Sequence, residues 1–306
     1  GARSTVAGTD AHLASMRYAS DMRPSASESK LHDGARWPRL LRNRFLQNRF
    51  WCSYKMFLLL LSAVGMGAPG LVIYQRRPTT RSEQHAERAD TPSARIAGQA
   101  DGRWMALHES FVKRAAAGGI ELLFLGDSLT MQWLQHPAWR DEWEPRGAVN
   151  FGIGGDRIQH AHWRVEHGEI DIAPPPKACV LQLGTNNIES DSVEEILRGV
   201  SSLLRLLRSR WAGTAVVLVG LFPRGVAASN PLRDKVRRVN LGLSSLVARE
   251  SSGRLLFLDA AALMPLRPDG ALDRAWTFDY VHLTNEMYTR YGEALLEVLR
   301  PFVQPR

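Results

Sequence analysis

Five short apolar runs of this 306-residue chain alternate with five amphipathic segments, and this alternation limits the fold more than any other feature. The apolar runs are predicted strands near residues 121–125, 147–151, 178–183, 214–221 and 255–258. The amphipathic segments are predicted helices near residues 103–117, 156–167, 191–210, 232–250 and 286–300. Repeated strand–helix units form parallel sheets with helices on both faces. The alternation therefore predicts an α/β protein, built as a three-layer α/β/α sandwich.

Ser128 lies where the first apolar run gives way to Gly126 and Asp127. In an open parallel sheet the carboxyl ends of the strands form the ligand crevice. A helix starting just after Ser128 would also direct unpaired backbone N–H groups toward a developing negative charge. The serine is therefore a candidate nucleophile. The simpler alternative is that Ser128 only caps the next helix, because Asp and Ser are preferred N-cap residues.

A candidate base and its orienting group lie near the carboxyl end of the chain. Asp279 and His282 are three residues apart, in the loop that enters the predicted last helix. A carboxylate at this spacing can hold the imidazole in one tautomer, while the imidazole accepts the proton of the serine. The alternative is a helix-entry aspartate beside an incidental surface histidine.

Two further apolar runs end in glycine and small polar residues, as the first one does. Gly155 follows the second run, and Asn186 follows the third. If the strands are parallel, both residues reach the same rim as Ser128, with a backbone N–H and a side-chain amide as donors for an oxyanion. Each could also be an ordinary turn residue. Dismissing the site would require four such explanations at once.

The blocks around these positions resemble the SGNH or GDSL hydrolases, a family named for its Ser, Gly, Asn and His blocks. The resemblance covers residues 103–302 and is strongest to the catalytic subunits of intracellular platelet-activating factor acetylhydrolase. It implies a flavodoxin-like fold with five parallel strands. It also implies Ser128 as nucleophile, His282 as base and Asp279 as its partner, with Ser128, Gly155 and Asn186 forming the oxyanion hole. The loop Leu221–Gly225 departs from that subgroup by carrying Phe222, a larger side chain that bears on the acyl or leaving-group pocket.

Other hydrolase classes and cofactor chemistry are not indicated. Ser128 is not framed by the Gly-x-Ser-x-Gly elbow of α/β-hydrolases, and no Ser-x-x-Lys pair begins there. His160, His162 and His167 share one predicted helix, but their spacing does not stack them on one face, so a metal cluster is not expected. We expect neither a metal nor another cofactor.

The basic charge of the chain is concentrated before the predicted enzyme domain. Residues 1–100 hold 15 of the 39 Lys and Arg and 7 of the 31 Asp and Glu, which leaves 24 of each sign for the rest. A nucleic-acid-binding enzyme is expected to carry its basic excess on the folded domain, so nucleic acid is not a predicted partner. Composition predicts a disordered basic tail over 1–55, a linker over 75–100 and a catalytic domain over 101–306, which should be fully active by itself.

Between the tail and the linker, residues 56–74 form an uncharged stretch just long enough to span a bilayer as a helix. Six basic residues lie between positions 36 and 55 and three between 76 and 81, which favours a cytosolic N-terminus. The interpretation that we favour is a single-pass anchor with the catalytic domain on the lumenal or extracellular side. A cleaved signal peptide of a secreted enzyme is the second alternative, and a helix buried against the domain is the third.

Together these features predict an esterase that removes a short acyl group, acetyl above all, from a lipid or glycan through an acyl-enzyme on Ser128. The small-molecule ester is the expected partner, and a homodimer is a candidate assembly. Two alternatives stay open: acyl transfer through the same intermediate, and a catalytically silent binding subunit.

Overall fold

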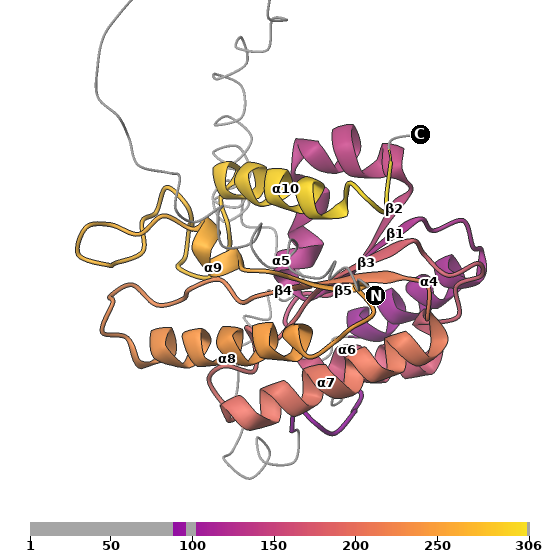
Figure 1. Cartoon of the computed structure of the whole chain (residues 1–306), viewed down its shortest axis with the longest axis horizontal. Coiled ribbons are helices and arrows are strands. Elements are labelled where there is room, and N and C mark those ends of the chain that lie inside the picture. Colours follow the sequence, from indigo (N-terminus) through magenta and orange to yellow (C-terminus); the bar gives the residue numbers. More distant parts are fainter. Residues whose placement is uncertain (1–87, 96–101, 305–306) are drawn as a thin grey trace, which may run out of the picture. The chain divides into compact units, whose positions relative to one another are not determined.

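The computed structural model describes residues 88–95 and 102–304, and all statements below concern these residues (Figure 1). Five parallel strands form one sheet in the order β2-β1-β3-β4-β5. They are β1 (Leu122–Gly126), β2 (Ala148–Gly152), β3 (Ala178–Gln182), β4 (Ala215–Val219) and β5 (Leu255–Leu258). In this order the chain reverses direction across the sheet at β1, which lies between β2 and β3. Ligands of doubly wound sheets bind at such a switch point.

Helices cover both faces of the sheet. The α-helices are α4 (Arg103–Ala116), α5 (Ser128–Met131), α6 (Ile158–Arg164), α7 (Val193–Arg210), α8 (Pro231–Ala248), α9 (Ala260–Leu263) and α10 (Asn285–Leu299). Short 3₁₀ or π-helical segments span Gln132–Gln135, Trp139–Trp143, Glu144–Arg146 and Val165–Glu169. The predicted three-layer α/β/α sandwich with five parallel strands is confirmed.

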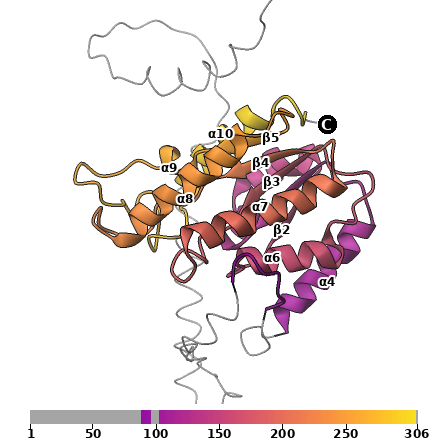
Figure 2. The ribbon, with the colours of Figure 1, turned by 60° about the horizontal axis from the view of Figure 1, so that its bottom comes forward.

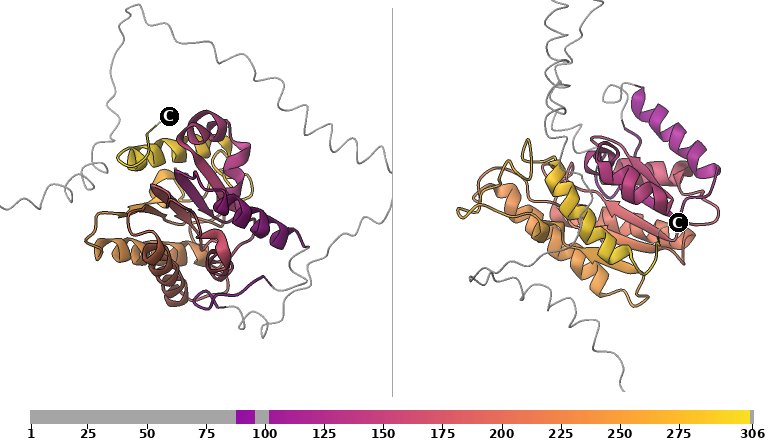
Figure 3. Two further views of the ribbon diagram at one scale, coloured as in Figure 1. Left: turned by 90° about the vertical axis from the view of Figure 1, so that its right-hand side faces the viewer. Right: turned by 90° about the horizontal axis from the view of Figure 1, so that it is seen from above.

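Strand side chains alternate between two apolar cores. Leu123 and Leu125 of β1 face the core under α4, α6, α7 and α8, whereas Leu122 and Phe124 face the core under α5, α9 and α10 (Figure 2). The second core also holds a cluster of large aromatic rings, and the two helical layers lie on opposite sides of the sheet (Figure 3). Because both faces of β1 are fully buried, its carboxyl end is a rigid support for the residues that follow it.

The residues before the helices explain where the helices begin. Ser192 and Glu195 form a reciprocal capping box at the start of α7. Asn230 accepts a hydrogen bond from Leu232 N at the start of α8, and proline occupies the first turn of that helix. Thr284 caps α10 in the same way, which fixes the point where the loop carrying His282 ends.

Several predictions about the leader lie outside the described residues. The basic tail over 1–55 and the apolar stretch over 56–74 are both in this part of the chain. Among the helices of residues 88–95 and 102–304, none has both the length and the hydropathy of a transmembrane span. The predicted linker is described in part, and it differs from the expectation. Its residues 88–95 pack on the domain, with Ala89 fully buried in the core under α7.

Candidate active site

Ser128 is the first residue of α5, one residue after the loop position Asp127 that follows β1. Asp127 accepts a hydrogen bond from Leu129 N at 2.9 Å and so caps the short helix. Capping is therefore the function of the aspartate, and the hydroxyl of Ser128 is left for another partner. That partner is His282, whose Nε2 lies 2.9 Å from Ser128 Oγ.

A compact loop brings Asp279 and His282 together. One oxygen of Asp279 accepts from the backbone N–H groups of Val281 at 3.0 Å and His282 at 2.7 Å. The other oxygen lies 2.7 Å from His282 Nδ1. The bridge between Thr277 and Leu283 closes this loop, and the exposed Phe278 ring stacks on the imidazole. The predicted pairing of the two residues is therefore local, as their spacing suggested.

The electrostatics of the pair suit a base with a fixed tautomer. Partial burial raises the pKa of Asp279, but the hydrogen bonds from the His282 side chain, the His282 backbone and the Val281 backbone outweigh it and leave the pKa below its usual value. Asp279 is therefore a carboxylate at neutral pH. It accepts the Nδ1 proton of His282 and leaves Nε2 free to accept a proton from Ser128 Oγ.

Gly155 lies in a tight turn after β2. Asp156 N donates to Ile153 O at 3.1 Å, and Gly155 has φ +79°, which is typical of the third position of a type II turn. A Cβ built on Gly154 would lie 3.9 Å from Ser128 Cβ, so this turn runs beside the serine. The N–H of Gly155 has no acceptor among the residues that the structure describes.

Asn186 lies after β3, and its position is fixed by the same turn. Its Nδ2 donates to Asp156 O at 2.8 Å, which uses one of the two amide hydrogens and leaves the other free. Gly126 of β1 pairs with Gly152 of β2 and Gln182 of β3. The loops that carry Ser128, Gly155 and Asn186 therefore leave the sheet at one edge.

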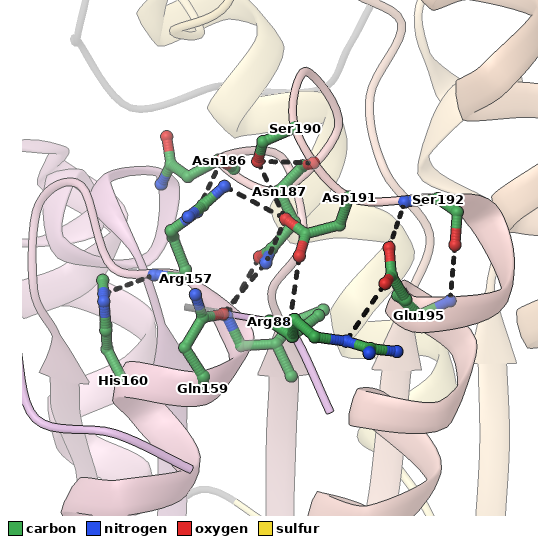
Figure 4. Close-up of polar contacts among 12 residues, drawn as sticks. Arg88, Arg157, Gln159, His160, Asn186, Asn187, Ser190, Asp191, Ser192 and Glu195 are labelled. Atoms are coloured by element: carbon green, nitrogen blue, oxygen red, sulfur yellow. Dashed lines mark hydrogen bonds and ion pairs between the residues drawn. The ribbon is translucent and has the colours of Figure 1, made fainter. Parts of the chain in front are cut away.

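A buried carboxylate behind Asn186 organises this loop (Figure 4). Asp191 accepts hydrogen bonds from Ala89 N, Arg157 Nη2, Asn187 Nδ2 and Ser190 Oγ, at 2.9–3.1 Å. Asn187 is fully buried and also accepts from Ile158 N at 3.0 Å. The second asparagine of the pair is thus a structural residue, unlike the partly exposed Asn186.

Sequence reasoning missed a charged cluster beneath the Gly155 turn. Arg164 is fully buried and donates to Asp156 Oδ2 at 2.8 Å, to Glu169 and to Phe151 O at 3.2 Å. Trp104 Nε1 donates to the other Asp156 oxygen at 2.7 Å. The signal in the sequence is an arginine and two carboxylates spaced around a predicted helix, but only packing shows that they are buried.

The remaining histidines do not converge. His160 and His162 are buried in α6, and His167 is exposed and stacks on Trp163. Within the described part of the chain, no three His, Cys, Asp or Glu side chains are arranged to hold a metal ion. Phe222, the departure in the Leu221–Gly225 loop, is buried against Tyr291.

Comparison with known proteins agrees with this geometry. The GDSL-like lipase/acylhydrolase family matches residues 124–290, which contain the whole Ser128–His282 arrangement. The chain belongs to this family. The GDSL-like acylhydrolase is therefore a carboxylic ester hydrolase, and the resemblance seen in the sequence is confirmed.

Its curated relatives include platelet-activating factor acetylhydrolase IB subunits. Subunit alpha1 of Bos taurus is 39% identical over 201 residues, which cover 66% of this chain and 84% of the relative. Subunit alpha2 of Rattus norvegicus is 33% identical over 223 residues, covering 73% and 95%. A solved GDSL-like lipase of Bacteroides thetaiotaomicron has a TM-score of 0.52 at 19% identity, covers 63% of this chain and 97% of its own, and shows the shared fold.

Proposed function

We propose that the GDSL-like acylhydrolase removes short acyl groups, acetyl above all, from a lipid or glycan ester through an acyl-enzyme on Ser128. The observation that carries the proposal is the continuous hydrogen-bonded chain from Ser128 Oγ through His282 to Asp279, at 2.9 and 2.7 Å. The names of the platelet-activating factor acetylhydrolase relatives support an acetyl ester as the substrate.

The first half of the reaction would transfer the acyl group to the enzyme. Ser128 Oγ attacks the ester carbonyl carbon while His282 Nε2 accepts the hydroxyl proton, and the Asp279 carboxylate stabilises the resulting imidazolium. The carbonyl oxygen becomes an oxyanion, which would accept from Gly155 N–H, from the free amide hydrogen of Asn186 and from Ser128 N–H. As the bond to the leaving alkoxide breaks, His282 returns the proton to that oxygen.

The second half would release the acid. Water attacks the acyl carbon of the Ser128 ester while His282 accepts its proton, and the oxyanion forms again at the same donors. Collapse of this intermediate breaks the bond to Ser128 Oγ, and the proton on His282 restores the hydroxyl. An alcohol in place of water would give acyl transfer, so product analysis with an added alcohol distinguishes hydrolysis from transfer.

The test of the nucleophile is Ser128→Ala, with Thr130→Val as a matched control. Thr130 carries the nearest other hydroxyl in the same helix and is buried. We expect Ser128→Ala to lose turnover of p-nitrophenyl acetate by roughly 10⁴-fold or more and to lose labelling by a fluorophosphonate probe. Thr130→Val should still be labelled. A Ser128→Ala variant that still reacts with the probe would refute the assignment.

The test of the acyl preference is a comparison of p-nitrophenyl acetate, butyrate and octanoate, followed by acetylated glycerophospholipids and acetylated oligosaccharides. We expect kcat/KM to fall with acyl length. A preference for octanoate would contradict the short-acyl proposal without touching the Ser128 mechanism.

Membrane attachment through residues 56–74, with the domain on the lumenal or extracellular side, stays a prediction, as do the secreted alternative and the homodimer. Alkaline carbonate extraction of the full chain tests the anchor, because an embedded helix resists extraction while a charge-bound protein does not. Light scattering of the purified protein tests the homodimer.

A further inference from the structure

Residues 88–95 form a segment, here called the clamp, that joins the two loops carrying Gly155 and Asn186 (Figure 2). At one end Ala89 N donates to Asp191 at 3.0 Å, behind the Asn186 loop. In the middle Ser93 N donates to Gln159 O at 3.3 Å. At the other end Arg95 Nη1 donates to Gly154 O at 3.0 Å, in the turn that precedes Asp156.

The bond from Arg95 fixes the central peptide of that turn. Type I and type II turns differ by a flip of the peptide between their second and third residues, here Gly154 and Gly155. In a trans peptide the C=O and the N–H point in opposite directions. Because Arg95 holds Gly154 O on one side, the N–H of Gly155 is held facing the other side. Two glycines in succession give this peptide little resistance to flipping without such a bond.

Arg95 is electrostatically suited to this position. Arg157 and Arg224 donate to the carbonyls of Asn186 and Thr185 in the neighbouring loop, and each also pairs with a carboxylate. Arg95 has no carboxylate partner among the described residues, and its buried Nε has no acceptor there either. The half-buried guanidinium therefore shares its charge with no described carboxylate and donates to the Gly154 carbonyl. A charged donor on the carbonyl polarises the peptide and strengthens its N–H as a donor.

We propose that Arg95, supplied from outside the predicted domain by the clamp, is a positioning residue for the oxyanion hole. It holds the Gly154–Gly155 peptide with its N–H toward Ser128 and raises the donor strength of that N–H as charge develops on the substrate. This inference rests on the proposed acyl-enzyme mechanism. It adds a group that acts through Gly155 without touching the substrate.

The experiment compares Arg95→Ala, Arg95→Lys and Arg88→Ala in the full chain with p-nitrophenyl acetate. Arg88 is the matched control, because it lies in the same segment but pairs with Asp90 and Glu195 at the surface, where an ion pair contributes little. We expect Arg95→Ala to lower kcat by roughly 10- to 100-fold with KM nearly unchanged, a loss at or below that of a whole oxyanion donor. Arg95→Lys keeps a charged donor and should lie between Arg95→Ala and the wild type. Arg88→Ala should match the wild type.

Two further readouts separate this role from a merely structural one. The rate of fluorophosphonate labelling should fall with kcat, because phosphonylation also places an oxygen in the oxyanion hole. Guanidinium ions, well below denaturing concentrations, should restore part of the kcat of Arg95→Ala and leave Arg88→Ala unaffected, even if the variant is less stable.

The outcomes distinguish this inference from the proposed function. An inactive wild-type chain would contradict the esterase itself. If the wild type is active, four results would each overturn the role of Arg95. Arg95→Ala could keep its kcat, or its loss could be confined to KM. Arg88→Ala could lose as much as Arg95→Ala, or guanidinium could fail to restore the kcat of Arg95→Ala.

Discussion

Replacement of Arg164 by methionine should unfold the enzyme at a markedly lower temperature. The Arg164 side chain is fully buried and lies between Asp156 and Glu169, whose side chains are 0% and 1% exposed. Burial lowers the pKa of Arg164, but the charges of Glu169 and Asp156 outweigh it and raise the pKa, so the arginine stays charged. Methionine fills a similar volume without the charge.

The magnitude follows from what the substitution leaves behind. Asp156 would keep the donor Trp104 Nε1 and the more distant His160 Nδ1, at 3.9 Å, and Glu169 would keep His108 Nδ1. Both carboxylates would stay buried without the arginine that they share. Breaking a buried ion pair by removing one partner costs about 3–5 kcal/mol. In a domain of this size each kcal/mol corresponds to roughly 2–4 °C in Tm, so we expect Tm to fall by about 6–20 °C.

The assay is thermal unfolding followed by circular dichroism, with Arg237→Met as the control. Arg237 pairs with Asp234, but both side chains are mostly exposed, at 66% and 59%. An exposed pair contributes little, so the control should change Tm by less than about 2 °C. Equal small shifts in both variants would refute the reasoning, because the buried cluster would then contribute no more than a surface pair. If Arg164→Met lowers kcat at temperatures where the variant is folded, the buried charged cluster also supports the Gly155 turn, because Asp156 belongs to both.

Three further predictions follow from other parts of the structure. Asn186→Ala should lower kcat for p-nitrophenyl acetate by roughly 10²- to 10³-fold with only a small fall in Tm, since it loses one partly buried bond to Asp156 O. Asn187→Ala should lower Tm more, because it removes buried hydrogen bonds to Gln159 and Asp191, and an unchanged Tm would contradict this assignment. Burial raises the pKa of Asp127 to about 7 from 3.8. Between these pH values the folded state therefore binds more protons than the unfolded state, so the free energy of unfolding falls as pH rises from about 4 to 7. Asp127→Asn keeps the cap acceptor and should remove that loss, which urea unfolding at pH 5 and pH 8 measures; parallel pH profiles for variant and wild type would count against it. A chain beginning at residue 101 should have a lower Tm and kcat than one beginning at residue 87, because it lacks the Ala89 and Arg95 contacts. Equal Tm and kcat values for the two chains would show that the clamp contributes nothing.

The layered fold could be predicted from the sequence because its signals are local. Apolar runs such as Leu122–Leu125 read as buried strands, and the segments between them have helical periodicity. The candidate site was predictable for a related reason. Carboxyl ends of parallel strands meet at one edge, so Ser128, Gly155 and Asn186 follow from the strand assignment. Asp279 and His282 pair within a single loop, which their spacing alone allows.

The supports of the site depend on contacts between segments far apart in the chain. Composition marked residues 75–100 as a linker, yet Ala89 bonds Asp191, 102 positions later, and Arg95 bonds Gly154, 59 positions later. Such bonds need α6 and α7 packed together on the sheet, since the Ala89 backbone lies against Gly199 of α7, where a Cβ would clash with Ala89 O and meet Ile158 of α6 at 3.0 Å. No local pattern encodes this contact, since it is a property of the packed helices.

The sequence by itself thus determined the order of strands and helices along the chain, the sheet edge at which the candidate site lies, and the residues that meet there. Tertiary structure alone decided which charged groups support that edge. Arg164 and Arg95 look like ordinary surface arginines in the sequence, but packing places one between two buried carboxylates and the other on a single carbonyl. The physical reason is that the cost of burying a charge depends on the partners around it, and those partners come together only in the folded chain.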